Sequence, residues 1–136
     1  MEEPIFDFEI VTPFRRVYTG KVKSVVAPGF EGYFGVLARH APFVSSIKIG
    51  EIKVDTGEEV LYFATSGGFA EVLPRKVTIL AETAEEAAEI DLARAEAARE
   101  RAQKRLSEGR KNWDVERAQA ALARALNRIK VAHRVA

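Results

Sequence analysis

Two arginine-rich stretches near the C-terminal end carry the residue types best suited to chemistry. The segment AEIDLARAEAARERAQKRL, residues 88–106, reads as a helix with an alanine stripe and arginines on its other faces. Arg94 and Arg101 are two turns apart on it, and Arg124 and Arg128 are one turn apart further along. Like charges at that closer spacing repel, so the arrangement is unfavourable unless an anion lies among them. Guanidinium groups bind phosphate oxygens through paired hydrogen bonds, which makes a polyphosphate a suitable anion.

The four arginines meet if their helices pair in opposite directions. With a turn near residue 110, Arg94 faces the neighbourhood of Asn127 and Arg128, and Arg101 faces residues 120–124. The alternative leaves the arginines solvated or paired with nearby acids, which are Glu96, Glu100 and Glu116. Both interpretations stay open on the residues alone.

The elements that would hold these arginines are two helices. Their signal is an apolar stripe at alternating steps of three and four, formed by Val115, Ala118, Leu122, Ala125, Ile129 and Ala132. Asp91 and Asp114 are expected N-caps, and Gly109 separates the helices. The pattern predicts an antiparallel two-helix hairpin. Because it has few large apolar residues, we expect it to be marginally stable alone and to depend on a partner or ligand.

The first part of the chain has the two-residue period of strands. Phe6, Phe8 and Ile10 share one face of the first expected strand. Further expected strands cover residues 21–26, 33–37, 51–54, 60–65, 69–73 and 77–81, with glycine- or proline-containing turns between them. Short strands at this spacing predict an antiparallel β-sandwich or barrel. The expected fold class is α+β, with a β-sandwich over residues 1–85 followed by a helical hairpin over 86–136.

Composition narrows the classes of function. The 136 residues include no cysteine, and neither His40 nor His133 has a partner at metal-binding spacing, so no metal site is expected. Neither a signal peptide nor a membrane-spanning run is recognised, so we expect no direct insertion into the membrane. Residues 86–136 carry twelve Lys or Arg against eight Asp or Glu, whereas residues 1–85 carry nine against twelve. The excess of positive charge in the helical part favours an anionic partner there.

Two long motifs resemble those of a known family. The stretch IVTPFRRVYTGKVKSVVAPGFEGYFGVLARHAPFV, residues 10–44, and the stretch SGGFAEVLPRKVTILAE, residues 66–82, are similar to signatures of the epsilon subunit of the bacterial F-type ATP synthase. That resemblance implies an N-terminal β-sandwich and a C-terminal pair of helices. It also implies a rotor subunit of the central stalk that couples rotation between the c-ring and gamma, and whose helices inhibit ATP hydrolysis.

The resemblance also assigns residues. Nucleotide-responsive members carry an Ile/Leu-Asp-x-x-Arg-Ala motif, which stands here as Ile90, Asp91, Arg94 and Ala95. By the same resemblance Glu85, Ile90 and Asp91 face the adenine of a regulatory ATP, with or without magnesium, and Arg94, Arg101, Arg124 and Arg128 surround its phosphates. No other cofactor is implied.

Partners follow from the resemblance as well. Glu31 and Tyr33 lie in a loop similar to the one that faces the c-ring, although an ordinary turn would explain them equally. The helices would meet the catalytic alpha/beta ring at an acidic segment of beta, and the sandwich would meet gamma. The implied location is peripheral, on the cytoplasmic face of the bacterial plasma membrane.

Two other classes of function compete with this interpretation. An independent enzyme is disfavoured, because the sequence has no phosphate-binding loop of the Gly-x-x-x-x-Gly-Lys-Ser/Thr type and no nucleophile elbow, and Ser66 has no evident histidine partner. No catalytic residue is assigned, and His40 is expected to be a structural histidine beside a turn. The second rival is a basic helical module for an anionic partner such as nucleic acid. Stacking on bases would require exposed aromatics, and Trp113 is the sole aromatic in the helical part.

Overall fold

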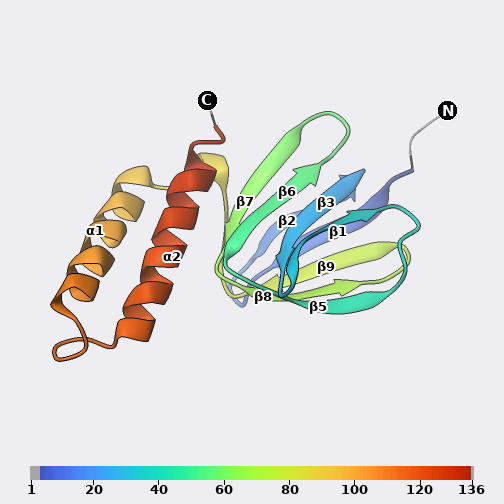
Figure 1. Cartoon of the computed structure of the whole chain (residues 1–136). Coiled ribbons are helices and arrows are strands. Elements are labelled where there is room, and N and C mark those ends of the chain that lie inside the picture. The colour runs from blue at the N-terminus through green and yellow to red at the C-terminus, as the bar shows by residue number, and fades with distance from the viewer. Residues whose placement is uncertain (1–3, 136) are drawn as a thin grey trace. The chain divides into compact units, whose positions relative to one another are not determined.

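The chain consists of a β-rich unit followed by a helical unit. The computed structural model describes residues 4–135, and the chain divides into the compact units Met1–Glu86 and Ala87–Ala136. Figure 1 shows the strands gathered in the first unit and the two long helices in the second. This is the predicted order of a β-sandwich followed by a helical hairpin.

Ten strands form the first unit. They are β1 (Phe6–Val11), β2 (Arg16–Val22), β3 (Ser24–Gly29), β4 (Gly32–Leu37), β5 (Phe43–Ile47), β6 (Gly50–Asp55), β7 (Val60–Thr65), β8 (Gly68–Val72), β9 (Lys76–Ala81) and β10 (Ala84–Glu86). They hydrogen-bond in the order β10-β7-β6-β3-β5-β8-β9-β1-β2, with β4 paired to β3. Neighbouring strands are antiparallel except β1 and β9, which are parallel. The last long strand, β9, thus lies beside the first strand of the chain.

The core of the sandwich is made of large apolar side chains that alternate along the strands. Phe6, Phe8 and Ile10 are all buried, as their spacing predicts. Phe63 on β7 and Ile52 on β6 face each other across the ladder and are also fully buried. Each of the strands β1 to β9 thus contributes at least one apolar side chain to a common interior.

The strand predictions differ from the structure at three places, the shortest being β10, whose three residues were not predicted. The expected strand at residues 21–26 is two strands, because the chain changes partners at Lys23, leaving β1 for β4 and β6. The β5 strand was not predicted, since its sequence FVSSI lacks apolar alternation and it buries only Ile47. Its pairing with β8, a contact between distant parts of the sequence, holds it in the sheet.

The second unit is the predicted hairpin. A short 3₁₀ turn, η1 (Ala87–Glu89), precedes α1 (Leu92–Glu108), and α2 (Val115–Ala132) returns antiparallel to it. The Asp91 carboxylate accepts a hydrogen bond from the Arg94 N–H at 3.1 Å, and Asp114 does the same for Arg117. Gly109, with φ of 77°, ends α1 in a conformation that favours glycine. The predicted caps and break are therefore confirmed.

Candidate functional site

Small side chains form the contact between the two helices. Ala95 and Ala102 are buried on α1, and Ala118 and Ala125 are buried on α2. Ala95 and Ala125 are equally far in sequence from Arg110, and so are Ala102 and Ala118, so the antiparallel helices bring each pair to the same level. Alanine lets the two backbones approach closely. The larger side chains of the same faces, such as Leu106 and Leu122, are only half-buried.

An arginine precedes each of these four alanines. Arg94, Arg101, Arg117 and Arg124 stand directly before Ala95, Ala102, Ala118 and Ala125. Because the two helices run in opposite directions, the residue before an interface position lies on the same side of both. Arg128 lies one turn beyond Arg124 on that side. We call the surface formed by these five residues the arginine face.

Four members of the arginine face are exposed and carry no counter-charge. Within residues 4–135, Arg94, Arg101, Arg117 and Arg124 make no ion pair with any acid of the chain. Arg128 is half-buried. The helices thus gather positive charge on one surface, and four of its arginines have no counter-charge among the described residues, which favours an anionic ligand.

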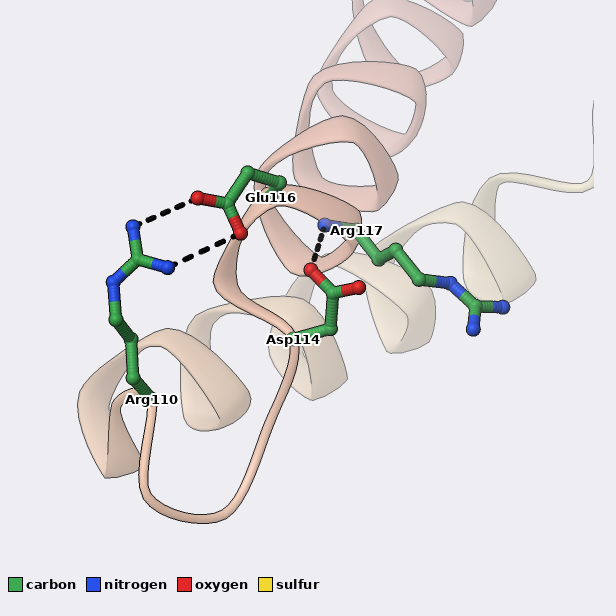
Figure 2. Close-up of polar contacts among 4 residues, drawn as sticks. All are labelled: Arg110, Asp114, Glu116 and Arg117. Atoms are coloured by element: carbon green, nitrogen blue, oxygen red, sulfur yellow. Dashed lines mark hydrogen bonds and ion pairs between the residues drawn. The ribbon is translucent and has the colours of Figure 1, made fainter.

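The acids that the sequence offered as alternative partners lie elsewhere. Glu96 follows Ala95 directly, so it belongs to the opposite side of the hairpin, and Glu100 points away from the helix contact. Glu116 is held by Arg110 of the interhelical loop, at 2.7 and 3.3 Å between guanidinium nitrogens and carboxylate oxygens (Figure 2). This pairing lowers the pKa of Glu116 and raises the pKa of Arg110. Among the described residues, these acids therefore do not pair with Arg94, Arg101 or Arg124.

The other residues of the predicted nucleotide set have separate positions. Asp91 caps α1, Ile90 is buried beside it, and Ala95 is a fully buried contact between the helices. Glu85 belongs to the β-rich unit, where β10 pairs it with Ala64 of β7. The motif residues thus build the start of α1, and the predicted phosphate ligands share one surface. Arg117 was missed, although its signal is plain: an Arg-Ala pair repeats at seven-residue spacing in each helix.

A second candidate surface lies at the turn between β3 and β4. Glu31 is exposed at the tip, and Tyr33 is 57% exposed while its hydroxyl accepts a hydrogen bond from the Glu51 N–H at 3.1 Å. Gly32 has a φ of 132°, which permits the tight turn between them. The turn borders a groove of about 530 Å³ whose wall is largely aromatic, with Phe30, Phe34 and Phe43 among its residues. Exposed aromatic side chains are typical of a surface that contacts another protein, and an ordinary turn does not need them.

A third surface is apolar and lies on the outside of the sheet. Phe69 on β8 and Leu80 on β9 are register partners and are 59% and 52% exposed. Val11 continues their row on β1, and together with Pro13 these residues line a groove of about 420 Å³. An exposed apolar pair on neighbouring strands, extended by half-buried Val11, is typical of a surface that contacts another protein.

The histidine predicted to be structural is held in place on both sides of its ring. His40 Nδ1 lies 2.6 Å from the Leu37 carbonyl oxygen, and Nε2 contacts the Leu73 carbonyl oxygen. Its ring also meets Phe6 edge to face. These contacts tie the turn after β4 to the turn after β8, so His40 has a structural role.

Neither a metal centre nor a membrane-spanning helix is found in the described part of the chain. Among residues 4–135, no three His, Cys, Asp or Glu side chains gather as metal ligands would. In the same residues, neither helix combines the length and apolar character needed to cross a bilayer.

Comparisons with known proteins agree over nearly the whole chain. The family model described as the ATP synthase delta/epsilon chain, beta-sandwich domain, matches residues 5–87, and the one described as its long alpha-helix domain matches residues 88–133. The chain is 55% identical to an ATP synthase epsilon chain of Syntrophobacter fumaroxidans, over 93% of this chain and 94% of the relative. It is 45% identical to that of Desulforamulus reducens, over 91% and 94%.

Solved structures share the fold. A chain of the Euglena gracilis mitochondrial ATP synthase superposes with a TM-score of 0.77 at 24% identity, covering 90% of this chain and 79% of that one. A central-stalk chain of the Tetrahymena thermophila mitochondrial ATP synthase gives 0.59 at 13% identity, covering 98% of both. At these identities the likeness concerns the fold.

Proposed function

The chain belongs to the ATP synthase delta/epsilon family, and we propose that its hairpin is an ATP-responsive brake on hydrolysis while its sandwich couples the rotor. It is an epsilon-type subunit of the central stalk, and epsilon chains are non-catalytic parts of the enzyme. The nucleic-acid alternative has no support among the relatives. Trp113, the aromatic it needed, is already engaged with Arg105 and Glu108.

The observation that carries the proposal is the arginine face, on which Arg94, Arg101 and Arg124 are exposed and make no ion pair within residues 4–135. Arg94, Arg101, Arg124 and Arg128 bind the phosphates of one ATP, and Glu85 with Ile90 and Asp91 receives the adenine. Guanidinium–phosphate hydrogen bonds are charge-assisted and bidentate, so four arginines suit a triphosphate well.

ATP changes the state of the hairpin because its binding requires arginines from both helices at once. Arg94 and Arg101 lie on α1, whereas Arg124 and Arg128 lie on α2. ATP therefore binds the closed hairpin better than separated helices, and a ligand shifts an equilibrium by that difference in affinity. The alanine contact between the helices is weak enough for this difference to decide the state.

Without ATP, the helices extend toward the catalytic alpha/beta ring and inhibit hydrolysis. Beyond Glu116, α2 carries basic residues and no acid, so an acidic segment of beta is a complementary partner. The same arginines would thus serve the nucleotide in one state and the catalytic ring in the other.

The sandwich supplies the permanent contacts. We assign the turn with Glu31 and Tyr33 to the c-ring, because its aromatic groove offers a protein contact beside an exposed acid. The apolar row of Val11, Phe69 and Leu80 is assigned to gamma, which must hold the subunit through rotation. As part of the synthase, the subunit is peripheral to the membrane, and we assign it to the cytoplasmic face.

Calorimetric titration of ATP into the full chain, with and without magnesium, tests the nucleotide proposal. We expect micromolar or tighter binding, and a loss of about tenfold or more for Arg94→Ala or Arg128→Ala, since hydrogen bonds to charged groups contribute about 1.5–3 kcal/mol. Arg99→Ala is the matched control, because Arg99 lies on the other side of α1. The absence of heat at millimolar ATP would reject the site.

Truncation after Glu89 tests the brake. The shortened chain keeps every strand, so it should still assemble with gamma. Hydrolysis by the assembled complex should then rise relative to the complex with the full chain. Unchanged hydrolysis would contradict inhibition by the helices, and failed assembly would show that the helices anchor the subunit.

A further inference from the structure

The loop between the helices is built from side-chain contacts that reach in both directions. At its start, Arg110 forms a two-fold contact with Glu116 in the first turn of α2, at 2.7 and 3.3 Å (Figure 2). At its end, Trp113 lies against the Arg105 guanidinium, 4.8 Å from ring centroid to Cζ, and its Nε1–H donates to the Glu108 carboxylate. One contact ties the loop forward to α2, and the other ties it back to the last turn of α1.

The backbone of the loop is ordered in the same way. The N–H groups of Asn112 and Trp113 both donate to the Gly109 carbonyl oxygen, at 3.3 and 3.2 Å. Asp114 then caps α2 through the Arg117 N–H (Figure 2). Backbone and capping hydrogen bonds therefore hold the loop at Asn112, Trp113 and Asp114.

The helix contact leaves part of the register of α1 against α2 to other contacts. Its fully buried members are the alanines Ala95, Ala102, Ala118 and Ala125, which cannot interlock. A slide by one turn, about 5.4 Å, brings Leu122 or Ile129 opposite an alanine of α1, and both of these larger side chains are only half-buried. The register therefore depends on contacts outside the buried alanines as well.

Register matters because the arginine face is shared between helices. Arg94 and Arg101 keep their positions relative to Arg124 and Arg128 only while α1 and α2 stay aligned. A shift of one turn separates guanidinium groups that would contact the same phosphate chain. Binding then requires the ligand to restore the alignment first, which weakens its apparent affinity.

We propose that Arg110, Trp113 and Glu116, with Arg105 and Glu108 as their anchors on α1, form a loop clasp that sets the helix register and aligns the arginine face for a phosphate ligand. These are positioning residues, since their contacts are within the chain. The inference rests on the proposed nucleotide site for its functional consequence. Its structural consequence, a fixed register, stands apart from any ligand.

Two measurements on the same variants test the clasp. The chain has no cysteine, so spin labels at Gln103→Cys and Gln119→Cys report one interhelical distance. Both positions are exposed and directly follow interface alanines, which places them on the side away from the arginine face. Pulsed electron resonance gives the distance distribution, and calorimetry with magnesium ATP gives the affinity.

We expect Arg110→Ala and Trp113→Ala each to broaden the distance distribution and to weaken ATP binding about two- to fivefold, as suits exposed ion-pair and cation–π contacts. Lys111→Ala is the matched control, because it removes one positive charge from the same loop and Lys111 has no side-chain partner among the described residues. The exchange Arg110→Glu with Glu116→Arg should restore part of both readouts. Restoration stays partial because the new arginine meets the positive end of the α2 dipole.

Each other outcome is decisive. An unchanged distribution in both variants overturns the clasp, whatever happens to affinity. A broadened distribution with unchanged ATP affinity overturns its role in aligning the arginine face. If the unaltered chain binds no ATP, the proposed nucleotide site fails, and the distance distributions alone then decide whether the clasp sets the register.

Discussion

The two units of this chain bury very different side chains. The difference predicts a stable sandwich and a hairpin whose state a bound ligand can change. The sandwich encloses phenylalanine, isoleucine and valine from all its long strands. The fully buried members of the hairpin contact are alanines, with Ala95 and Ala102 on α1 and Ala118 and Ala125 on α2. Burying an alanine stabilises far less than burying a phenylalanine, because stabilisation follows the apolar area removed from water. If the hairpin responds to ATP as proposed, the two units divide the tasks of stability and response between them.

The largest effect should come from the sandwich core. Phe63→Ala removes a fully buried ring, and we expect the free energy of unfolding of the sandwich to fall by about 3–5 kcal/mol. Urea unfolding followed by circular dichroism measures it. Val60→Ala on the same strand is the control, since Val60 is 43% exposed. A loss below about 1 kcal/mol for Phe63→Ala would mean that the core does not carry the stability of this unit.

A smaller but more localised effect is expected from the helix contact. Ala102→Leu adds three carbons where the backbones are close, and overpacking of this kind costs about 1–3 kcal/mol. Hydrogen exchange should speed up in α1 and α2 and stay unchanged in β7 and β9. Ala97→Leu, at an exposed position of the same helix, should have little effect. If exchange in the strands rose as well, the two units would not be energetically separate.

Helix capping should have an effect of about 1 kcal/mol. Asp91→Ala removes the acceptor of the Arg94 N–H, and an N-cap of this kind contributes about 0.5–2 kcal/mol. Asp91→Asn keeps an acceptor and is expected to preserve most of the helix. Thermal melting followed at 222 nm compares the two variants. Equal melting curves for Asp91→Ala and the unaltered chain would contradict the capping role.

The smallest effect should be a pH dependence of the interhelical loop. The hydrogen bond from Arg110 lowers the pKa of Glu116 below its ordinary value. The Arg110–Glu116 pair therefore contributes above the ordinary carboxyl pKa, and its contribution is lost as the pH falls through the lowered value. The difference in hairpin melting temperature between the unaltered chain and Glu116→Gln should shrink from pH 7 to pH 3. A constant difference would show that the pair is without effect on the hairpin.

The sequence predicts the local features of both units well. Alternation located β1, β7 and β9, and the aspartates with Gly109 marked the ends of the helices. It could not predict β5 or the parallel pairing of β1 with β9, because those depend on contacts between distant segments. Lys23 sits at a change of partner strand that no local pattern marks.

The candidate site likewise has features that the local sequence predicts and features that depend on the path of the folded chain. Reversal of the chain near residue 110 predicts that Arg94, Arg101, Arg124 and Arg128 lie together, and the helix positions agree. The loop clasp could not be predicted, since Arg110 and Trp113 meet their partners only through a particular backbone path. The nucleotide roles of Glu85, Ile90 and Asp91 stay predictions, as do the contacts of Glu31 and Tyr33 with the c-ring.

Hydrogen–deuterium exchange of the full chain with and without magnesium ATP tests the central claim most directly. If the hairpin is a ligand-dependent element joined to a permanently stable sandwich, ATP will slow exchange throughout α1 and α2 and leave the core strands unchanged. Protection of both helices would also be lost in Arg94→Ala. Equal exchange in the helices at saturating ATP would contradict the account, because a ligand held by both helices cannot leave their opening unaffected.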